Sequence, residues 1–195
     1  MKGNQMTKYL IAVALSFTAI SPAFSADNQG KMYLDISGGK TYGLNGLDNG
    51  TSTSALFGYQ FNPKFSAEGG YTSLANNANI NNLATGVTGN SSVAGGEVAA
   101  LINFPVTLRS AIFARLGYAY MMATGEVTNL GTNTTLSEVD FAGATYGLGV
   151  KYYLGRLFAV SAGFNVYQLN NSSCTTTTGC TISPTTVHAD LVFRF

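Results

Sequence analysis

Phe57-Gly-Tyr-Gln-Phe-Asn-Pro-Lys-Phe-Ser-Ala-Glu-Gly-Gly-Tyr71 is the stretch of sequence that decides the fold. On both sides of Asn62-Pro63-Lys64, apolar or aromatic residues take alternate positions, and polar or small residues mostly take the positions between them. Alternation of this kind is typical of a β-strand with two different faces. Asn and Pro are residues that favour turns. The stretch therefore predicts a β-hairpin with one apolar face and one polar face.

The same alternation recurs along the chain, and the connections between the alternating segments give the number of strands. Three connections are short (62–64, 105–109 and 154–156) and four are long and polar (about 42–52, 75–91, 124–138 and 170–184). Long and short connections alternate, and together they join eight strands. Tight turns at one end and long loops at the other are typical of outer-membrane barrels. The predicted fold class is all-β, an eight-stranded antiparallel up-and-down transmembrane β-barrel.

The composition agrees with a membrane protein that crosses the bilayer with strands. Charged residues make up 10% of the 195 residues, against about 25% in an ordinary soluble domain. Beyond the first residues, the chain has no uninterrupted apolar stretch long enough for a membrane-spanning helix. Open strand edges cannot be satisfied in lipid, so a spanning sheet must close. A net charge of +1 gives no basic field for nucleic acid.

The first residues have the pattern of an export signal. Lys2 and Lys8 precede an apolar run, 9–20, which the small residues Ala23 and Ser25 follow. We predict a signal peptide at 1–25, cleaved after residue 25 or 26, and an outer-membrane barrel domain at 26–195. The alternative is an uncleaved anchor helix, for which the run is short.

Export also bears on the two cysteines of the chain, Cys174 and Cys180, which enclose a Thr-rich stretch. Two neighbouring cysteines usually pair in an oxidising compartment, so we expect a disulfide within this loop.

The alternation assigns a direction to each side chain. The apolar set should face lipid, because Arg or Lys there would cost about 2–4 kcal/mol at the midplane, and the polar set should face inward. A soluble barrel with an apolar interior would reverse these faces. The fourth strand is less clear, since Ala99 and Leu101 fall on its inward face. The predicted interior charge network consists of Asp35, Glu68, Glu97, Arg115, Lys151, Asp190 and Arg194.

Three segments resemble the barrel domain of OmpA-type outer-membrane proteins. The Gly58-Tyr-Gln-Phe-Asn-Pro63 turn with Glu68 after it is similar to the second hairpin of that family. Arg115-Leu-Gly117 is similar to its fifth strand, and Phe193-Arg-Phe195 to its terminus. The sequence ends where a soluble peptidoglycan-binding domain would follow in full-length members, so no tether to the cell wall is expected.

We predict a structural or surface-interaction role in the bacterial envelope. The alternative, which the resemblance suggests for Glu68 and Arg115, is a narrow gated ion channel. Phe193 and Phe195 match the C-terminal insertion signal read by the barrel-assembly machinery, although Asp190 replaces the usual Gly. Expected partners are outer-membrane lipid and lipopolysaccharide, the assembly machinery, and host or phage surfaces at the loops. We expect a monomer in the outer membrane, with both ends of 26–195 in the periplasm.

A lipid-modifying envelope enzyme is the third class considered. Most sites of that kind use a His beside a Ser or a carboxylate, because a base must activate the nucleophile. The one His of the chain, His188, has Asp190 as its neighbour on the same face and no assigned nucleophile. We therefore predict no enzymatic activity, and no cofactor or metal.

Overall fold

The computed structural model describes residues 31–44, 49–79, 87–129, 132–135, 138–171 and 181–195. The predicted signal peptide and the pair Cys174–Cys180 lie outside these residues. Within the described part of the chain, no helix has the length and hydropathy needed to cross a membrane.

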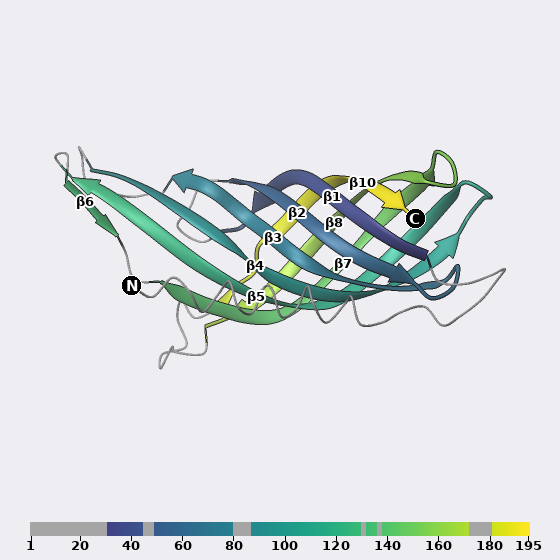
Figure 1. The fold of residues 1–195 in the computed structure, drawn as a ribbon. Helices are drawn as coiled ribbons and strands as arrows, with labels where there is room; N and C mark the ends of the chain where they lie inside the picture. Colours follow the sequence, from purple (N-terminus) through teal and green to yellow (C-terminus); the bar gives the residue numbers. More distant parts are fainter. Residues whose placement is uncertain (1–30, 45–48, 80–86, 130–131, 136–137, 172–180) are drawn as a thin grey trace.

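The described chain forms ten strands that run up and down around one axis (Figure 1). They are β1 (Lys31–Tyr42), β2 (Gly50–Gln60), β3 (Phe65–Asn79), β4 (Val87–Pro105), β5 (Ser110–Asn129), β6 (Thr132–Thr135), β7 (Val139–Tyr153), β8 (Phe158–Asn170), β9 (Thr181–Ile182) and β10 (Thr185–Arg194).

Eight of these strands form a closed barrel. Every pairing is antiparallel, in the order β10-β1-β2-β3-β4-β5-β7-β8, and β10 also pairs with β8 to close the sheet. The short strands β6 and β9 pair with β5 and β8, at the ends of those strands that lead into the long connections. Closure removes the open edges that a flat sheet would present. The predicted eight-stranded antiparallel barrel is confirmed.

The three short connections lie at one end of the barrel, which we call the turn end; the opposite end is the loop end (Figure 1). In the first turn the Asn62 side chain accepts hydrogen bonds from the backbone N–H groups of Lys64 and Phe65, at 2.8 and 3.0 Å. This is the side-chain mimicry of a backbone turn that makes Asn a turn residue. The backbone N–H of Val106 donates to Ser110 at 2.9 Å, and that of Leu154 to Phe158 at 3.0 Å.

Two of the predicted loops are wrong in their bounds. Strands β3 and β4 extend into the expected loop at 75–91, with irregular register around Ala75, and β5 extends into the expected loop at 124–138, where β6 pairs with it. These segments have lost the apolar alternation. Their backbone N–H and C=O groups can still pair with each other whatever the side chains are, so the strands continue past the point where the side-chain pattern ends.

The two faces of the wall have the predicted directions. Large apolar side chains point outward, with Ile36 47%, Leu116 66% and Val150 58% exposed. The charged residues between them, such as Glu68 and Arg115, are buried inside. A soluble barrel with the reverse arrangement is therefore excluded.

The interior at the loop end is apolar, which corrects the expectation of a polar inward face on every strand except the fourth. Leu74, Ala119, Met121 and Leu169 are completely buried there, and they pack with Leu44, Ala75, Ala78, Val93, Phe141 and Tyr167. We call these ten residues the apolar layer. An eight-stranded barrel is just wide enough for its side chains to fill it, and apolar side chains can do so without needing polar partners.

Candidate functional site in the barrel interior

The centre of the interior is an arginine held between two acids. Arg115 on β5 donates from Nε to Glu68 Oε1 on β3 at 2.7 Å and from Nη2 to Glu97 Oε1 on β4 at 2.8 Å. The three side chains are 2–4% exposed. Charges this deeply buried are tolerated when they are paired and hydrogen-bonded. We call Glu68, Glu97 and Arg115 the central ion triplet.

Neighbouring hydroxyl groups complete the triplet. The Tyr33 hydroxyl donates to Glu68 Oε2 at 3.0 Å, and Thr72 Oγ1 donates to Glu97 Oε1 at 2.8 Å. These bonds satisfy acceptor positions on the carboxylates that Arg115 leaves free, and charge-assisted bonds are stronger than neutral ones. The arrangement is therefore fixed in geometry as well as paired in charge.

Antiparallel register brings residues that are far apart in sequence close together here. Glu68 on β3 is opposite Ala99 on β4, and Leu101, two residues further along β4, is opposite Arg115 on β5. Across the β5–β7 pair, Arg115 is opposite Gly147.

Glycines make room for the aromatic side chains of the interior. Tyr33 is opposite Gly58, where an added Cβ would lie 2.0 Å from the ring. Phe113 is opposite Gly149 in the same way, at 2.4 Å. Glycines that alternate with apolar residues in the sequence thus leave the space that these interior rings fill.

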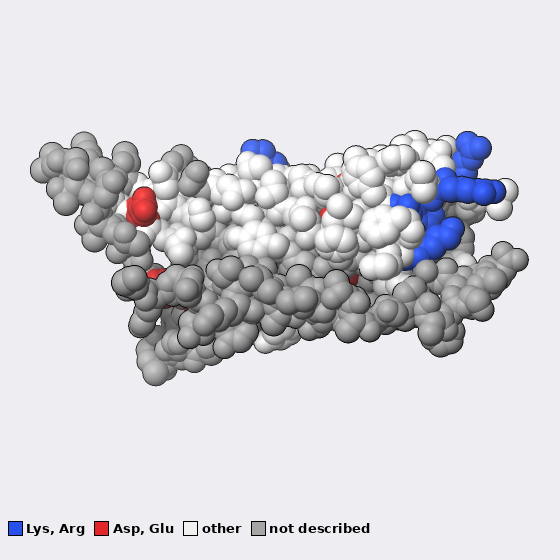
Figure 2. Space-filling view, in the orientation of Figure 1, with Lys and Arg blue, Asp and Glu red and all other residues white. Residues whose placement is uncertain are grey.

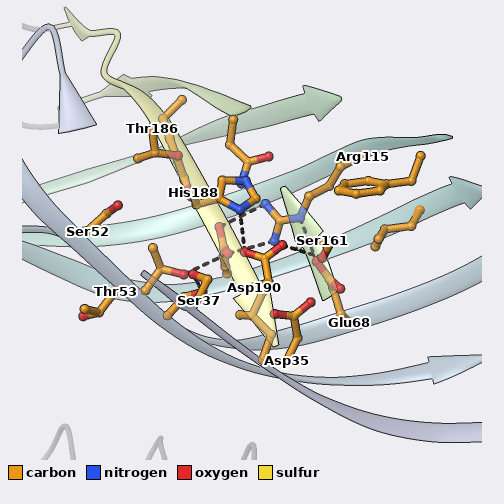
Figure 3. Close-up of a pocket in the computed structure, with 18 of the residues that line it drawn as sticks. Asp35, Ser37, Ser52, Thr53, Glu68, Arg115, Ser161, Thr186, His188 and Asp190 are labelled. Atoms are coloured by element: carbon orange, nitrogen blue, oxygen red, sulfur yellow. Dashed lines mark hydrogen bonds and ion pairs between the residues drawn. The ribbon is translucent and has the colours of Figure 1, made fainter. Parts of the chain in front are cut away.

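A second polar group lies beside the triplet, on β8 and β10 (Figure 3). Asp190 accepts a hydrogen bond from Ser161 Oγ at 2.6 Å through Oδ2, and its Oδ1 lies 2.6 Å from His188 Nδ1. Sequence reasoning placed His188 and Asp190 on one face but missed Ser161, which register alone brings opposite Asp190. The serine hydroxyl bonds to the acid and not to the histidine. In a Ser-His-acid site the hydroxyl bonds to the histidine.

The other predicted interior charges occupy separate positions. Lys151 Nζ lies 5.5 Å from the ring centroids of Tyr33 and Phe113, within range of a cation–π contact. Asp35 is buried and lines the same cavity as Lys151. Arg194 lies toward the turn end, where it donates to Gln60 Oε1 at 2.8 Å and stacks on Tyr153. The structure thus joins Glu68, Glu97 and Arg115 directly and brings Asp35, Lys151 and Asp190 around the same central cavity. Arg194 is the one predicted residue that lies apart, toward the turn end.

Two cavities lie inside the described part of the barrel. The central cavity, of about 30 Å³, is lined by both polar groups, and has room for about two water molecules. His188 Nε2, Ser52 Oγ and Asn165 Oδ1 line it and have no partner among the described protein atoms, so water in this cavity could satisfy them. A second cavity, of about 10 Å³, lies toward the turn end beside Arg194.

The described residues contain no group of three or more His, Cys, Asp or Glu side chains placed to hold a metal ion. Three of the interior acids, Glu68, Glu97 and Asp190, have Arg115, His188 and hydroxyl groups as polar partners.

Comparison with solved structures shows the same barrel in other proteins. Neisserial surface protein A has a TM-score of 0.55 and 14% identity, over 85% of this chain and 97% of that one. Ail, the attachment invasion locus protein of Yersinia pestis, has a TM-score of 0.54 and 11% identity, over 87% of this chain and all of Ail. A structure of Ail in complex with the heparin analogue sucrose octasulfate matches at a TM-score of 0.53 and 10% identity, over 87% and 100% of the two chains. At these identities the likeness concerns the fold.

Curated protein sequences give no match to the chain. The family model described as the outer membrane protein beta-barrel domain matches residues 10–195, which is nearly the whole sequence. The chain therefore belongs to the outer membrane protein β-barrel family.

Proposed function

We propose that this protein is an integral barrel of the bacterial outer membrane with a structural role, and that its loop end makes contacts outside the cell. The observation that carries the proposal is the outward apolar wall around a charged, closely filled interior. Side chains such as Phe57, Leu148 and Val160 are 37–50% exposed on that wall. A surface of this size and apolarity is stable when lipid covers it.

The orientation follows from the family arrangement, in which short turns face the periplasm and long loops face outward. On this proposal both ends of 26–195 are periplasmic, because β1 begins and β10 ends at the turn end. Removal of residues 1–25 as a signal peptide belongs to the same proposal, as does the Cys174–Cys180 disulfide. Phe193 packs edge-on against Phe158 at 5.2 Å, and with Phe195 it would serve as the insertion signal.

The interior supports a structural role over conduction. The central ion triplet is fully paired, the two cavities described above are small, and the apolar layer occupies the loop end. An ion crossing the barrel would have to break the triplet and then enter apolar surroundings, where an unpaired charge is costly. We also propose that the interior carries out no reaction, since Ser161 is bonded to Asp190 and not to His188.

The charge of the loop end indicates which kind of external surface it can contact. Ail was solved with sucrose octasulfate, a polyanion. Here the described residues near the loop end include the exposed acids Glu126, Glu138 and Asp140. Like charges repel, so we propose that the loop end contacts neutral or cationic surfaces and does not bind a heparin-like polyanion.

Single-channel conductance of the refolded protein in a planar bilayer tests the structural role. We expect no discrete conductance steps from the wild type. Steps that Glu68→Ala or Arg115→Ala alters would contradict the proposal and make the triplet a gate.

Separation of inner and outer membranes on a density gradient tests the location, and recovery of the protein with the inner membrane would count against it.

A further inference from the structure

Apart from Lys40, the exposed charges among the described residues are divided between the two ends of the barrel. Figure 2 shows Lys and Arg gathered at the end where the C-terminus lies in Figure 1, and an acidic patch at the opposite end. The exposed cationic side chains of the turn end are Lys31, Lys64, Arg109 and Arg156, which we call the basic rim. Lys40 is exposed on the outer wall, away from this rim.

No acidic side chain balances the basic rim among the described residues. Asp35, Glu68, Glu97 and Asp190 are buried in the interior, and the exposed acids lie at the other end. Clustered charge of one sign on a surface creates a field that attracts oppositely charged groups. The turn end therefore favours an anionic partner.

Exposed aliphatic side chains accompany the cations in two of the turns. Val106 is 62% exposed and Leu108 fully exposed beside Arg109, while Leu154 and Leu157 are 60% and 58% exposed beside Arg156. These side chains lie at the ends of the turns, beyond the outward apolar wall. Exposed apolar groups next to cations match the boundary between lipid headgroups and acyl chains, where long cationic side chains reach the phosphates.

From these two observations we propose that the basic rim and the turn leucines bind the phosphate headgroups of anionic phospholipids in the leaflet that the turn end enters. The inference rests on the proposed membrane location and adds a site and a lipid class to it. An anionic cell-wall polymer would also attract the cations, but it would leave Leu108 and Leu154 in water. Lipid accounts for both sets of side chains.

Native mass spectrometry of the full-length protein with bound lipid tests the proposal. The detergent-solubilised, folded protein is offered equal amounts of phosphatidylglycerol and phosphatidylcholine. We expect several-fold enrichment of retained phosphatidylglycerol in the wild type, and loss of most of that enrichment in the double variant Arg109→Gln with Arg156→Gln. Lys40→Gln removes one positive charge away from the rim and should keep the enrichment. Equal retention of both lipids by the wild type, or undiminished enrichment in the double variant, would overturn the proposal.

A second variant tests whether the turn leucines Leu108 and Leu154 contribute to lipid binding. Leu108→Ser with Leu154→Ser keeps every charge and should lower the retention of both lipids. Pelleting with purified peptidoglycan checks the other anionic partner: binding that the arginine variant abolishes and the leucine variant leaves unchanged would overturn the lipid assignment. A shift in gel mobility on heating, measured in neutral lipid, shows separately whether the barrel is folded. A protein that folds there but shows no lipid preference refutes this inference and leaves the membrane location standing.

Discussion

At the scale of single residues, the centre of the interior shows how buried charges are paired. Arg115 forms an ion pair with each of two carboxylates, and hydroxyls from Tyr33 and Thr72 donate further hydrogen bonds to them. Removing one member of a buried pair leaves an uncompensated charge, which costs more than the pair contributes. The triplet is therefore expected to be sensitive to the loss of any of its members.

Arg115→Ala should lower the free energy of unfolding by about 3–5 kcal/mol, because Glu68 and Glu97 would be left buried without a counter-charge. Urea unfolding in lipid vesicles, followed by gel mobility, measures this loss. Lys64→Ala removes an exposed cation in the first turn; it is the control and should change the unfolding free energy by well under about 1 kcal/mol. Equal effects of the two substitutions would contradict the pairing.

Space is the second constraint at this scale. Gly58→Ala should be destabilising by about 1–3 kcal/mol, because the new Cβ would overlap the Tyr33 ring. Gly38→Ala is a matched substitution in the neighbouring strand, where an added Cβ meets nothing within 4 Å, and it should be neutral or slightly stabilising. Comparing the urea midpoints of the two variants tests whether the glycine makes room for the ring.

At the scale of strands, the alternating pattern predicted which face of each strand points inward. It did so because side chains repeat with a period of two residues. Which charges meet was not predictable in the same way. Contact also requires equal height along the barrel, which depends on the stagger between strands. Glu68 thus meets Arg115, while Arg194 lies toward the turn end with Gln60.

In the halves of the strands near the loop end, the alternation predicted the direction of side chains but not where the strands end. Met121 has the same inward parity as Arg115, so its direction was readable from the sequence. The polar residues that follow it favoured a loop from about 124, whereas β5 continues to Asn129. Residues selected for hydrogen bonding with water carry little information about whether their backbones are paired.

Leu169→Ala should lower the free energy of unfolding by about 2–5 kcal/mol, because Leu169 is completely buried in the apolar layer. Leu154→Ala makes the same change at a turn residue that is 60% exposed, and should have a much smaller effect. The measurement is again the urea midpoint in neutral lipid vesicles. A similar loss in both variants would argue against a packed interior at the loop end.

At the scale of the whole molecule, three features each favour stability in lipid. They are the closure of the sheet, the apolar outer wall and the filled interior. Closure satisfies the backbone without water. The apolar wall suits lipid, and the interior takes up the charges that lipid cannot solvate. Family membership is shown by the match over residues 10–195, and the structural role and the orientation remain our proposals.

The most direct test of the central claim, a closed barrel stable in lipid, is gel mobility of the protein refolded in lipid vesicles, with and without heating. Such a barrel should resist detergent at room temperature because closure leaves no free strand edge. We predict that the unheated protein migrates differently from the heated protein. Identical mobility before and after heating, with the protein fully recovered in the lipid fraction, would contradict a closed and stable barrel.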